Sequence, residues 1–413
     1  MSLAIATIEA PLIDEGLRAQ GVEPLVIEWT PPARGDLADV ALLTRTYADD
    51  AVESGNREAL ARLDAARPHL VGAGLAVDLV PGMDERTILH AGPPCDWDHL
   101  GPAMRGQVAR AAVLEGWAPD QGEAALLIGQ GSIVLAPTDT RGVAATMCGV
   151  LSPSMAVWEV RDEETGAEAW APISDGAGDG LPAGTPTRDL IARQRMLSDR
   201  VAPGAAAALA ATGPIDLTDV ARRAADAGDA PACRPRVAGM MILHALLPGL
   251  ATRALDAIPA VALIAGGDGR MALPVLAAAA RAALESAAGT QRSSLVIGMS
   301  GNGTDVAITL AGMPGAWFTA PAPIAEGDGD GSAPPPDAAP WTGDQGVIAC
   351  ADMAIDARLC LDAGEAPGIA MGIAARGDGA WIGEGIARVP LPAVRDALDA
   401  LVPPRAQPLD APA

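Results

Sequence analysis

The sequence contains no lysine, so all 28 of its basic residues are arginine. A chain without lysine cannot use a Schiff-base lysine, a phosphate-binding G-x-x-x-x-G-K-[ST] loop or a kinase-type catalytic lysine. Aromatic residues are also scarce, because Tyr47 and Phe318 are the single tyrosine and the single phenylalanine beside eight tryptophans. Ring stacking against a ligand would therefore depend largely on tryptophan.

Long apolar runs and targeting patterns are missing as well. The most apolar segment, residues 237–250, is shorter than the roughly 20 residues that cross a bilayer, and it contains Pro248. The N-terminus lacks the positive start and the cleavage pattern of a signal peptide. Five scattered cysteines without a C-x-x-C spacing predict reduced thiols and neither a disulfide framework nor a zinc site. We expect a cytoplasmic protein without a metal or other cofactor.

The charge of the chain is strongly one-sided, with a net charge of −24 at pH 7. Nucleic acids and anionic membrane surfaces would meet general repulsion, which argues against both as partners. A small anionic substrate would instead need a local pocket of arginines. The 413 residues, half of them hydrophobic, suffice for two or three domains with a sizeable core.

Strand and helix patterns alternate over residues 1–175, which predicts an N-terminal α/β domain. The segments 2–10, 11–21 and 22–29 are typical of a strand, a helix and a strand. The usual right-handed crossover would make these two strands parallel. Further elements expected in this domain are helices at 36–46 and 50–66, strands at "TILHA", "AALLIG" and "SIVLAP", and a hairpin of "MAVWEV" and "AEAWAPI".

Beyond the first domain, composition predicts a helical and then a mixed domain. The Gly- and Pro-rich stretch 174–187 is expected to be a linker, with a phosphate-cradling loop as the alternative. Alanine and leucine dominate 187–290, which predicts a helical middle domain. Over 291–413 we expect a smaller α+β domain that has a hairpin around "SGNGTD", an irregular loop at 324–346 and a last helix near "LPAVRDALDAL". The fold class is thus α/β, or multi-domain α+β.

The strongest candidate site begins where an apolar strand ends. His90 closes the strand "TILHA" and is followed by a turn made of Gly92, Pro93 and Pro94. Sheets of α/β proteins bind ligands at this carboxyl edge of their strands. The sequence therefore predicts that His90 and the backbone of the turn meet a substrate. The alternative is a histidine that merely ends a buried strand.

A helix start completes this candidate site. Arg105 and Gly106 are expected to open the helix "RGQVARAAVLEGWA". A guanidinium and free amide N–H groups at a helix start favour a carboxylate or a phosphate. The alternative is that Arg105 pairs with one of the many acidic residues of the chain.

Three further turns offer hydrogen-bond donors to an anion. Ser154 lies in "GVLSPSMAVW", Asn302 and Thr304 lie in "GNGTD", and Thr319 lies in "WFTAPAPIAEG". Each segment has the Gly, Pro, Ser or Asn composition of an ordinary turn, so a purely structural role is the alternative at every one of them.

Six segments, taken in order, resemble the YlbE/AllG family of bacterial proteins. They are "LRAQGVEPLVIEWTPPARGD", "LHAGPP", "MRGQVARAAVLEGWAP", "GVLSPSMAV", "NGTDVAI" and "WFTAPAPIAEG", and together they span most of residues 1–327. The family includes a subunit assigned to oxamate carbamoyltransferase, which acts in anaerobic allantoin breakdown beside AllF-like (FdrA-like) and AllH-like subunits. The ordered set is more specific than any one segment.

The resemblance implies transfer of a carbamoyl group between an N-carbamoyl acid such as oxalurate and phosphate, which gives oxamate and carbamoyl phosphate. Arginine and backbone amides can hold two small anions together without lysine or metal. On this hypothesis Arg105 binds a carboxylate or phosphate, and His90 orients or protonates the carbonyl. Amides near Ser154 and Asn302 stabilise the oxyanion, and the chain works in a homo- or hetero-oligomer.

Three segments depart from the family pattern by losing polar residues. They lie around 232–236, at 266–273 and near Ala375, and the region 346–370 also looks shortened. These losses leave two alternatives to a divergent carbamoyltransferase. The chain could be a non-catalytic scaffold subunit, or an enzyme of specialised metabolism that uses the same anion site.

Overall fold

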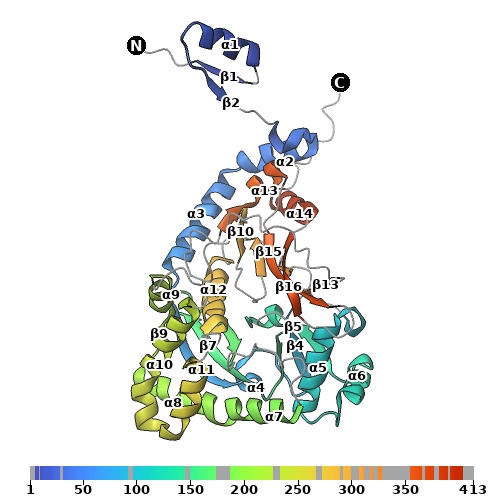
Figure 1. Ribbon diagram of the computed structural model, residues 1–413, viewed down its shortest axis with the longest axis vertical. Helices are drawn as coiled ribbons and strands as arrows, with labels where there is room; N and C mark the ends of the chain where they lie inside the picture. Colours follow the sequence, from blue (N-terminus) through green and yellow to red (C-terminus); the bar gives the residue numbers. More distant parts are fainter. Residues whose placement is uncertain are drawn as a thin grey trace, which may run out of the picture.

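The protein is a mixed α/β molecule in which several small sheets are covered by helices (Figure 1). The computed structural model describes residues 5–8, 10–27, 31–91, 96–144, 149–173, 187–226, 233–266, 272–288, 292–298, 307–310, 317–319, 324–327, 354–364, 368–375, 381–388 and 391–402. The expected mixed fold class is confirmed.

The chain begins with the predicted β-α-β unit. Strand β1 (Ala6–Ile8) pairs in parallel with β2 (Leu25–Ile27), and α1 (Pro11–Ala19) connects them. Proline suits the first helical position, because its missing N–H would have no partner there. The unit stands apart from the other elements in Figure 1, and large apolar side chains such as Leu12 (84% exposed) and Leu25 (66% exposed) face solvent.

Two helices and an antiparallel sheet follow this unit. The helices are α2 (Leu37–Tyr47) and α3 (Asp50–Ala65), and the sheet has the order β8-β7-β3-β9, with β3 (Pro68–Leu75), β7 (Ala156–Asp162), β8 (Glu168–Pro172) and β9 (Ile215–Asp216). The short helix α4 (Ala76–Leu79) follows β3. The hairpin of β7 and β8 and both helices agree with the sequence expectations.

A second, mixed sheet carries the candidate site. Its order is β5-β4-β6, made of β4 (Thr87–His90), β5 (Val134–Pro137) and β6 (Val150–Leu151). Strand β5 runs parallel to β4, and β6 runs antiparallel to it. Helix α5 (Pro102–Leu114) packs against β4 and β6 on one side and against α6 (Gln121–Gly129) on the other.

The expectation of a strand at "AALLIG" is wrong, because this segment lies within α6. The Asp120 side chain accepts the backbone N–H of Glu123 and caps the helix start. At the other end, Gly131 adopts a positive φ of 72°, and Ser132 N–H donates to the Leu127 carbonyl. A short apolar run is compatible with a strand or a helix, and the caps at its two ends favour the helix.

Helices dominate residues 187–288, as expected. They are α7 (Thr187–Met196), the π-helical turn η4 (Leu197–Val201), α8 (Ala202–Thr212), α9 (Leu217–Asp226), α10 (Cys233–Arg253), α11 (Ile258–Gly266) and α12 (Ala272–Ala288). Helices α8 and α12 lie against strands β3, β7 and β8. Their apolar side chains form one core with Leu70, Trp158 and Val160 of that sheet.

The last part of the chain contains two more sheets and two helices. The sheets are β12-β11-β10-β14 and β13-β15-β16, from β10 (Leu295–Gly298), β11 (Ala307–Leu310), β12 (Trp317–Thr319), β13 (Ile324–Gly327), β14 (Ala354–Asp356), β15 (Gly368–Ala375) and β16 (Trp381–Arg388). Strands β10 and β11 pair as the expected hairpin. Residues 324–327 are not loop, because they pair with β15.

A separate hydrophobic core joins residues 33–52 to the C-terminal helices. Helices α13 (Ala357–Ala363) and α14 (Leu391–Leu401) bury Leu361 and Leu398 against Leu42 and Leu43 of α2. The free thiol of Cys360 lies in this core, and burial raises its pKa to about 11. Two cores thus join segments that the sequence assigned to different domains, and the boundaries near 175 and 290 stay a prediction.

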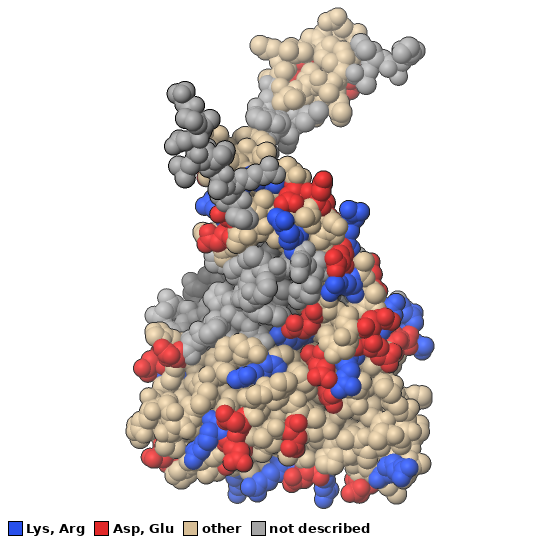
Figure 2. Space-filling view, turned by 180° about the vertical axis from the view of Figure 1, so that it is seen from behind, with Lys and Arg blue, Asp and Glu red and all other residues tan. Residues whose placement is uncertain are grey.

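Acidic and basic side chains alternate over the face shown in Figure 2. The described residues on that face form no extended basic patch, in keeping with the strong negative charge of the chain. Over the same described part of the chain, every helix is too short or too polar to span a bilayer.

Candidate functional site

His90 is the last residue of the central strand of its sheet. It pairs with Pro137 of β5 and Val150 of β6, and only 1% of its surface is exposed. Ile88 and Val150 pack with α5 in one apolar cluster, whereas Leu89 packs on the opposite face. Side chains alternate along a strand, so His90 lies on the face of the sheet that α5 covers.

The hydrogen bonds of His90 define its protonation state. Its Nδ1 lies 3.3 Å from the Ala91 carbonyl oxygen, which can only accept, so Nδ1 carries the proton. Burial lowers the pKa of His90 below 6.5, and the bond to Ala91 only partly opposes this effect. Nε2 is buried and makes no hydrogen bond to any residue that the structure describes. A neutral imidazole with an unused lone pair at Nε2 is equipped to accept a proton.

The lowered pKa predicts a pH-dependent contribution of His90 to stability. Since the unfolded histidine binds protons below about 6.5 and the buried one does not, the free energy of unfolding should fall as pH falls below that value. Urea unfolding at pH 5 to 8 should show a steeper loss for the wild type than for His90→Gln. Parallel pH curves for the two proteins would contradict a depressed pKa.

Arg105 lies in the first turn of α5 and holds the preceding loop. Its Nε donates to the Leu100 carbonyl at 2.7 Å, and Nη2 donates to the Asp98 carbonyl at 3.3 Å. The guanidinium carbon lies 6.0 Å from the ring centre of Trp97. Among the described residues, Arg105 therefore does not form the expected alternative, an ion pair with an acidic side chain. Its role in binding substrate stays a prediction.

The expected free amide of Gly106 is not present. Helix α5 begins at Pro102 and not at Arg105, because proline is favoured at the first helical position. The N–H of Arg105 already donates to the Gly101 carbonyl at 2.9 Å. Gly106 is the fifth helical residue, beyond the amides that a helix start leaves free. Gly106 can therefore contribute only by leaving open the space that a side chain at this position would fill.

Ser154 lies away from the start of α5. Its amide and its hydroxyl both donate to the Glu115 carboxylate, at 2.9 and 2.8 Å, and Glu115 caps the C-terminal end of α5. Ten residues of helix separate this end from Arg105, or about 15 Å. The Ser154 donors are thus occupied by a charged acceptor in this structure, and the expected oxyanion contact at this amide stays a prediction.

The remaining sequence-predicted residues are not placed in the site. Gly92, Pro93 and Pro94 lie outside the described residues, as do Asn302 and Thr304. Thr319 ends β12 and pairs with Ala307, and its side chain is outside the described set. Their contacts with a ligand stay predictions.

The structure adds Arg110, which the sequence reasoning missed. It lies in the middle of α5 and is only 9% exposed. Its Nη2 lies 3.7 Å from the point where a side chain on Gly106 would begin. The available signal was an arginine inside the apolar run "VARAAV", one helical turn after a glycine. Sequence alone did not show that this arginine is on the buried side.

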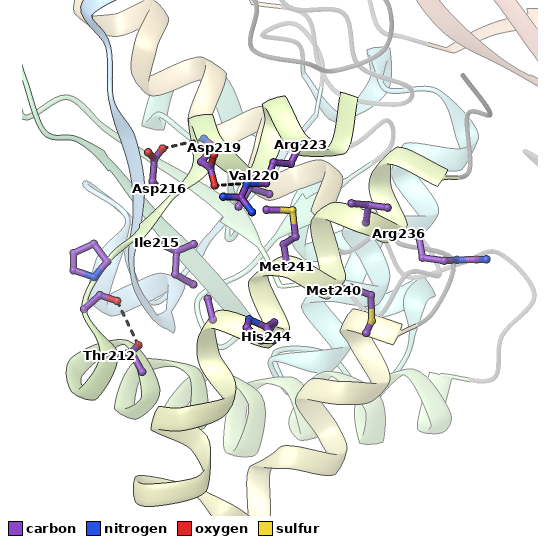
Figure 3. A pocket seen from close by; sticks show the side chains of 14 residues that line it. Thr212, Ile215, Asp216, Asp219, Val220, Arg223, Arg236, Met240, Met241 and His244 are labelled. Atoms are coloured by element: carbon purple, nitrogen blue, oxygen red, sulfur yellow. Dashed lines mark hydrogen bonds and ion pairs between the residues drawn. The ribbon is translucent and has the colours of Figure 1, made fainter. Parts of the chain in front are cut away.

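A hollow lies apart from the β4 and α5 region, between the end of α8, strand β9 and helices α9 and α10 (Figure 3). Its volume is about 840 Å³, and its lining includes Arg223, Arg236 and His244. Arg223 is largely exposed and already pairs with Asp219 at 2.8 Å. A paired and hydrated guanidinium holds a small anion weakly, so this hollow suits an oxyanion less well than the β4 and α5 region.

The described residues contain no cluster of three or more His, Cys, Asp or Glu that could hold a metal ion.

Fold and site define a mixed α/β protein in which one strand carries a buried histidine and the helix packed on it carries a buried arginine. A solved structure, "Crystal structure of a conserved protein of unknown function from Enterococcus faecalis V583", has a similar fold, with a TM-score of 0.70, 24% identity, and coverage of 85% of this chain and 97% of that one.

Sequence relatives identify the family. The family described as "Oxamate carbamoyltransferase subunit AllG" matches residues 133–345. The chain is 32% identical over 326 residues to "Uncharacterized protein YahG" of Escherichia coli (strain K12), covering 78% of this chain and 69% of that protein. It is 29% identical over 280 residues to "Oxamate carbamoyltransferase subunit AllG" of the same organism, covering 67% of each. The chain belongs to the AllG family.

Proposed function

We propose that this chain is a carbamoyltransferase-type subunit that acts on a small N-carbamoyl or amide acid and phosphate. The observation that carries the proposal is the neutral, buried imidazole of His90 with its unused Nε2. One relative is an oxamate carbamoyltransferase subunit of Escherichia coli, which supports the substrate class. The proposed site is the carboxyl end of β4 and the facing side of α5.

In the proposed reaction a phosphate oxygen attacks the carbamoyl carbon of an oxalurate-like acid. The bond from this carbon to the amide nitrogen breaks, which releases oxamate and carbamoyl phosphate. Nε2 of His90 takes the proton from the attacking phosphate and returns it to the leaving nitrogen. This assignment refines the expectation that His90 protonates the carbonyl, because its ring donates through Nδ1 to Ala91 and has only an acceptor free.

The surroundings of His90 suit this chemistry. A site without bulk water protects a reactive carbamoyl group from hydrolysis and strengthens charge interactions. Because Nε2 has no contact with solvent, substrate reaches it only when neighbouring side chains shift. The Nε and Nη2 atoms of Arg105 donate to the preceding loop. In the proposal, its remaining nitrogen, Nη1, donates to the substrate carboxylate.

The proposal is tested by reconstitution with AllF-like (FdrA-like) and AllH-like subunits, its proposed cytoplasmic partners. Carbamoyl phosphate should form from oxalurate only when phosphate and this chain are both present, and oxamate should appear in equal amount. Omission of this chain is the control. A reconstituted complex whose rate does not depend on this chain would contradict the proposal.

A specific observation favours a second candidate, a non-catalytic subunit that binds partner chains. Parallel sheets in proteins are normally covered on both faces, yet the two-stranded β1 and β2 sheet exposes Ile8 and Val26 beside Leu12, Ile13 and Leu25. Exposed apolar surface of this kind is typical of an interface. If the reconstituted complex needs this chain but keeps its rate when His90 is replaced, the scaffold role is the correct one.

A further inference from the structure

Arg110 is a charged side chain in apolar surroundings. Its helical neighbours Val108, Ala109, Ala111 and Ala112 are all buried in the cluster that α5 forms with the β4 sheet. Moving a guanidinium from water into such surroundings is costly unless a partner compensates the charge. Burial lowers the pKa of Arg110, and no acidic group in the described parts of the chain counters this effect.

The other buried arginines among the described residues have the partners that Arg110 lacks. Arg358, 3% exposed, contacts the carboxylates of Asp356 and Glu53, both at 2.6 Å. Arg281 pairs with Glu285 at 3.2 Å. Within the described part of the chain, Arg110 has no ion pair, and its buried Nε makes no hydrogen bond. The chain has 52 acidic residues, so a shortage of acidic side chains does not explain why Arg110 lacks an ion pair with the described residues.

The direction of the Arg110 side chain brings its charge toward the first half of α5. Helical side chains point back toward the N-terminus, and Nη2 lies one turn earlier on the same face of the helix, beside Gly106, which has no side chain to cover it. On the facing strand, His90 lies on the side that α5 covers and has its own buried atom without a partner. Two unsatisfied polar groups thus belong to one strand and helix layer.

We infer that Arg110 is an anion-binding residue of this protein and that its missing partner is a small oxyanion, of the phosphate or α-keto acid carboxylate class. A guanidinium offers a planar set of donors that matches two oxygens of such an anion. The inference adds an anion-binding residue to the proposed site. It rests on the proposed function only for the choice of phosphate and oxamate as the anions. A bound oxyanion would compensate the buried charge, which no acidic side chain among the described residues does.

The test is the thermal unfolding of the full chain with and without inorganic phosphate or oxamate, at constant ionic strength set with chloride. The wild type should melt at a higher temperature as either anion is added. Arg110→Met has a similar volume and no charge. Its unliganded form should melt at least as high as the wild type, because replacing an uncompensated buried charge by a packed apolar side chain is neutral or stabilising. Its anion-dependent shift should disappear.

Matched variants separate this role from a structural one. Arg358→Met removes a buried but paired arginine, so it should melt lower than the wild type and keep its anion-dependent shift. Arg110→Lys keeps the charge without the planar donor set, so its apparent Kd should rise at least tenfold. A wild type without an anion response would overturn the inference, and so would an Arg110→Met protein that melts lower and still responds. Because no partner subunit is present, these results are independent of carbamoyl transfer.

Discussion

Replacing His90 by glutamine is expected to lower kcat for phosphate-dependent carbamoyl transfer by about 10²- to 10⁴-fold, the usual contribution of a general base. Glutamine keeps a hydrogen-bonding side chain of similar length but cannot take a proton from phosphate. His90 already lies buried with Nε2 free, so the loss should appear in kcat more than in KM. Steady-state release of oxamate by the reconstituted complex measures it.

The matched control for this variant is His99→Gln. His99 ends the short 3-10 helix Trp97–His99 before α5, its side chain is 75% exposed, and its Nδ1 lies 4.0 Å from the Asp96 carboxylate. We expect its kcat to stay within about twofold of the wild type, as is usual for exposed positions. If the two histidine variants lose activity equally, or if neither does, His90 is not the base.

Replacing Asp162 by alanine is expected to lower the free energy of unfolding by about 3 to 5 kcal/mol, since four donors, among them the buried hydroxyl of Ser286, would lose their acceptor at once. Asp162 is fully buried at the end of β7. Its carboxylate accepts the backbone N–H groups of Arg67 and Thr165 and the hydroxyls of Thr165 and Ser286. The loss should be measured by urea unfolding.

The pKa of Asp162 gives this prediction a pH dependence. Burial alone would raise that pKa, but the hydrogen bonds from Thr165, Arg67 and Ser286 lower it below 3.8. The stabilisation is therefore complete above the unfolded pKa near 3.8 and is lost as pH falls toward the lower folded value. Exposed Glu163→Ala serves as the control and should cost less than about 1 kcal/mol. Equal losses for both variants would contradict the account.

Local signals in the sequence predicted much of the fold. The β-α-β start follows from Pro11 at a helix start and Gly21 after its end, with apolar strands on either side. The β7 and β8 hairpin follows from alternating apolar residues around a charged turn. The "AALLIG" segment failed because its identity depends on caps at Asp120 and Gly131, which lie outside the apolar run itself.

The candidate site was only partly accessible from the sequence. His90 at the end of a buried strand was predicted from the apolar run before it. Arg105 was correctly placed near a helix start, but the pairing of Ser154 with Glu115 is a contact across 39 residues that no local pattern encodes. Arg110 was missed for a similar reason. Whether an arginine in an apolar helix is buried without a partner depends on which acidic groups the tertiary fold brings near it.

The central claim is that the buried face between β4 and α5 binds a small oxyanion. A crystal structure of the protein with phosphate and oxamate tests it most directly. We predict an anion whose oxygens lie within hydrogen-bond distance of the Arg110 guanidinium, on the side of the sheet that His90 faces. An anion bound only in the hollow beside Arg223 and His244, with Arg110 still without a partner, would contradict the account.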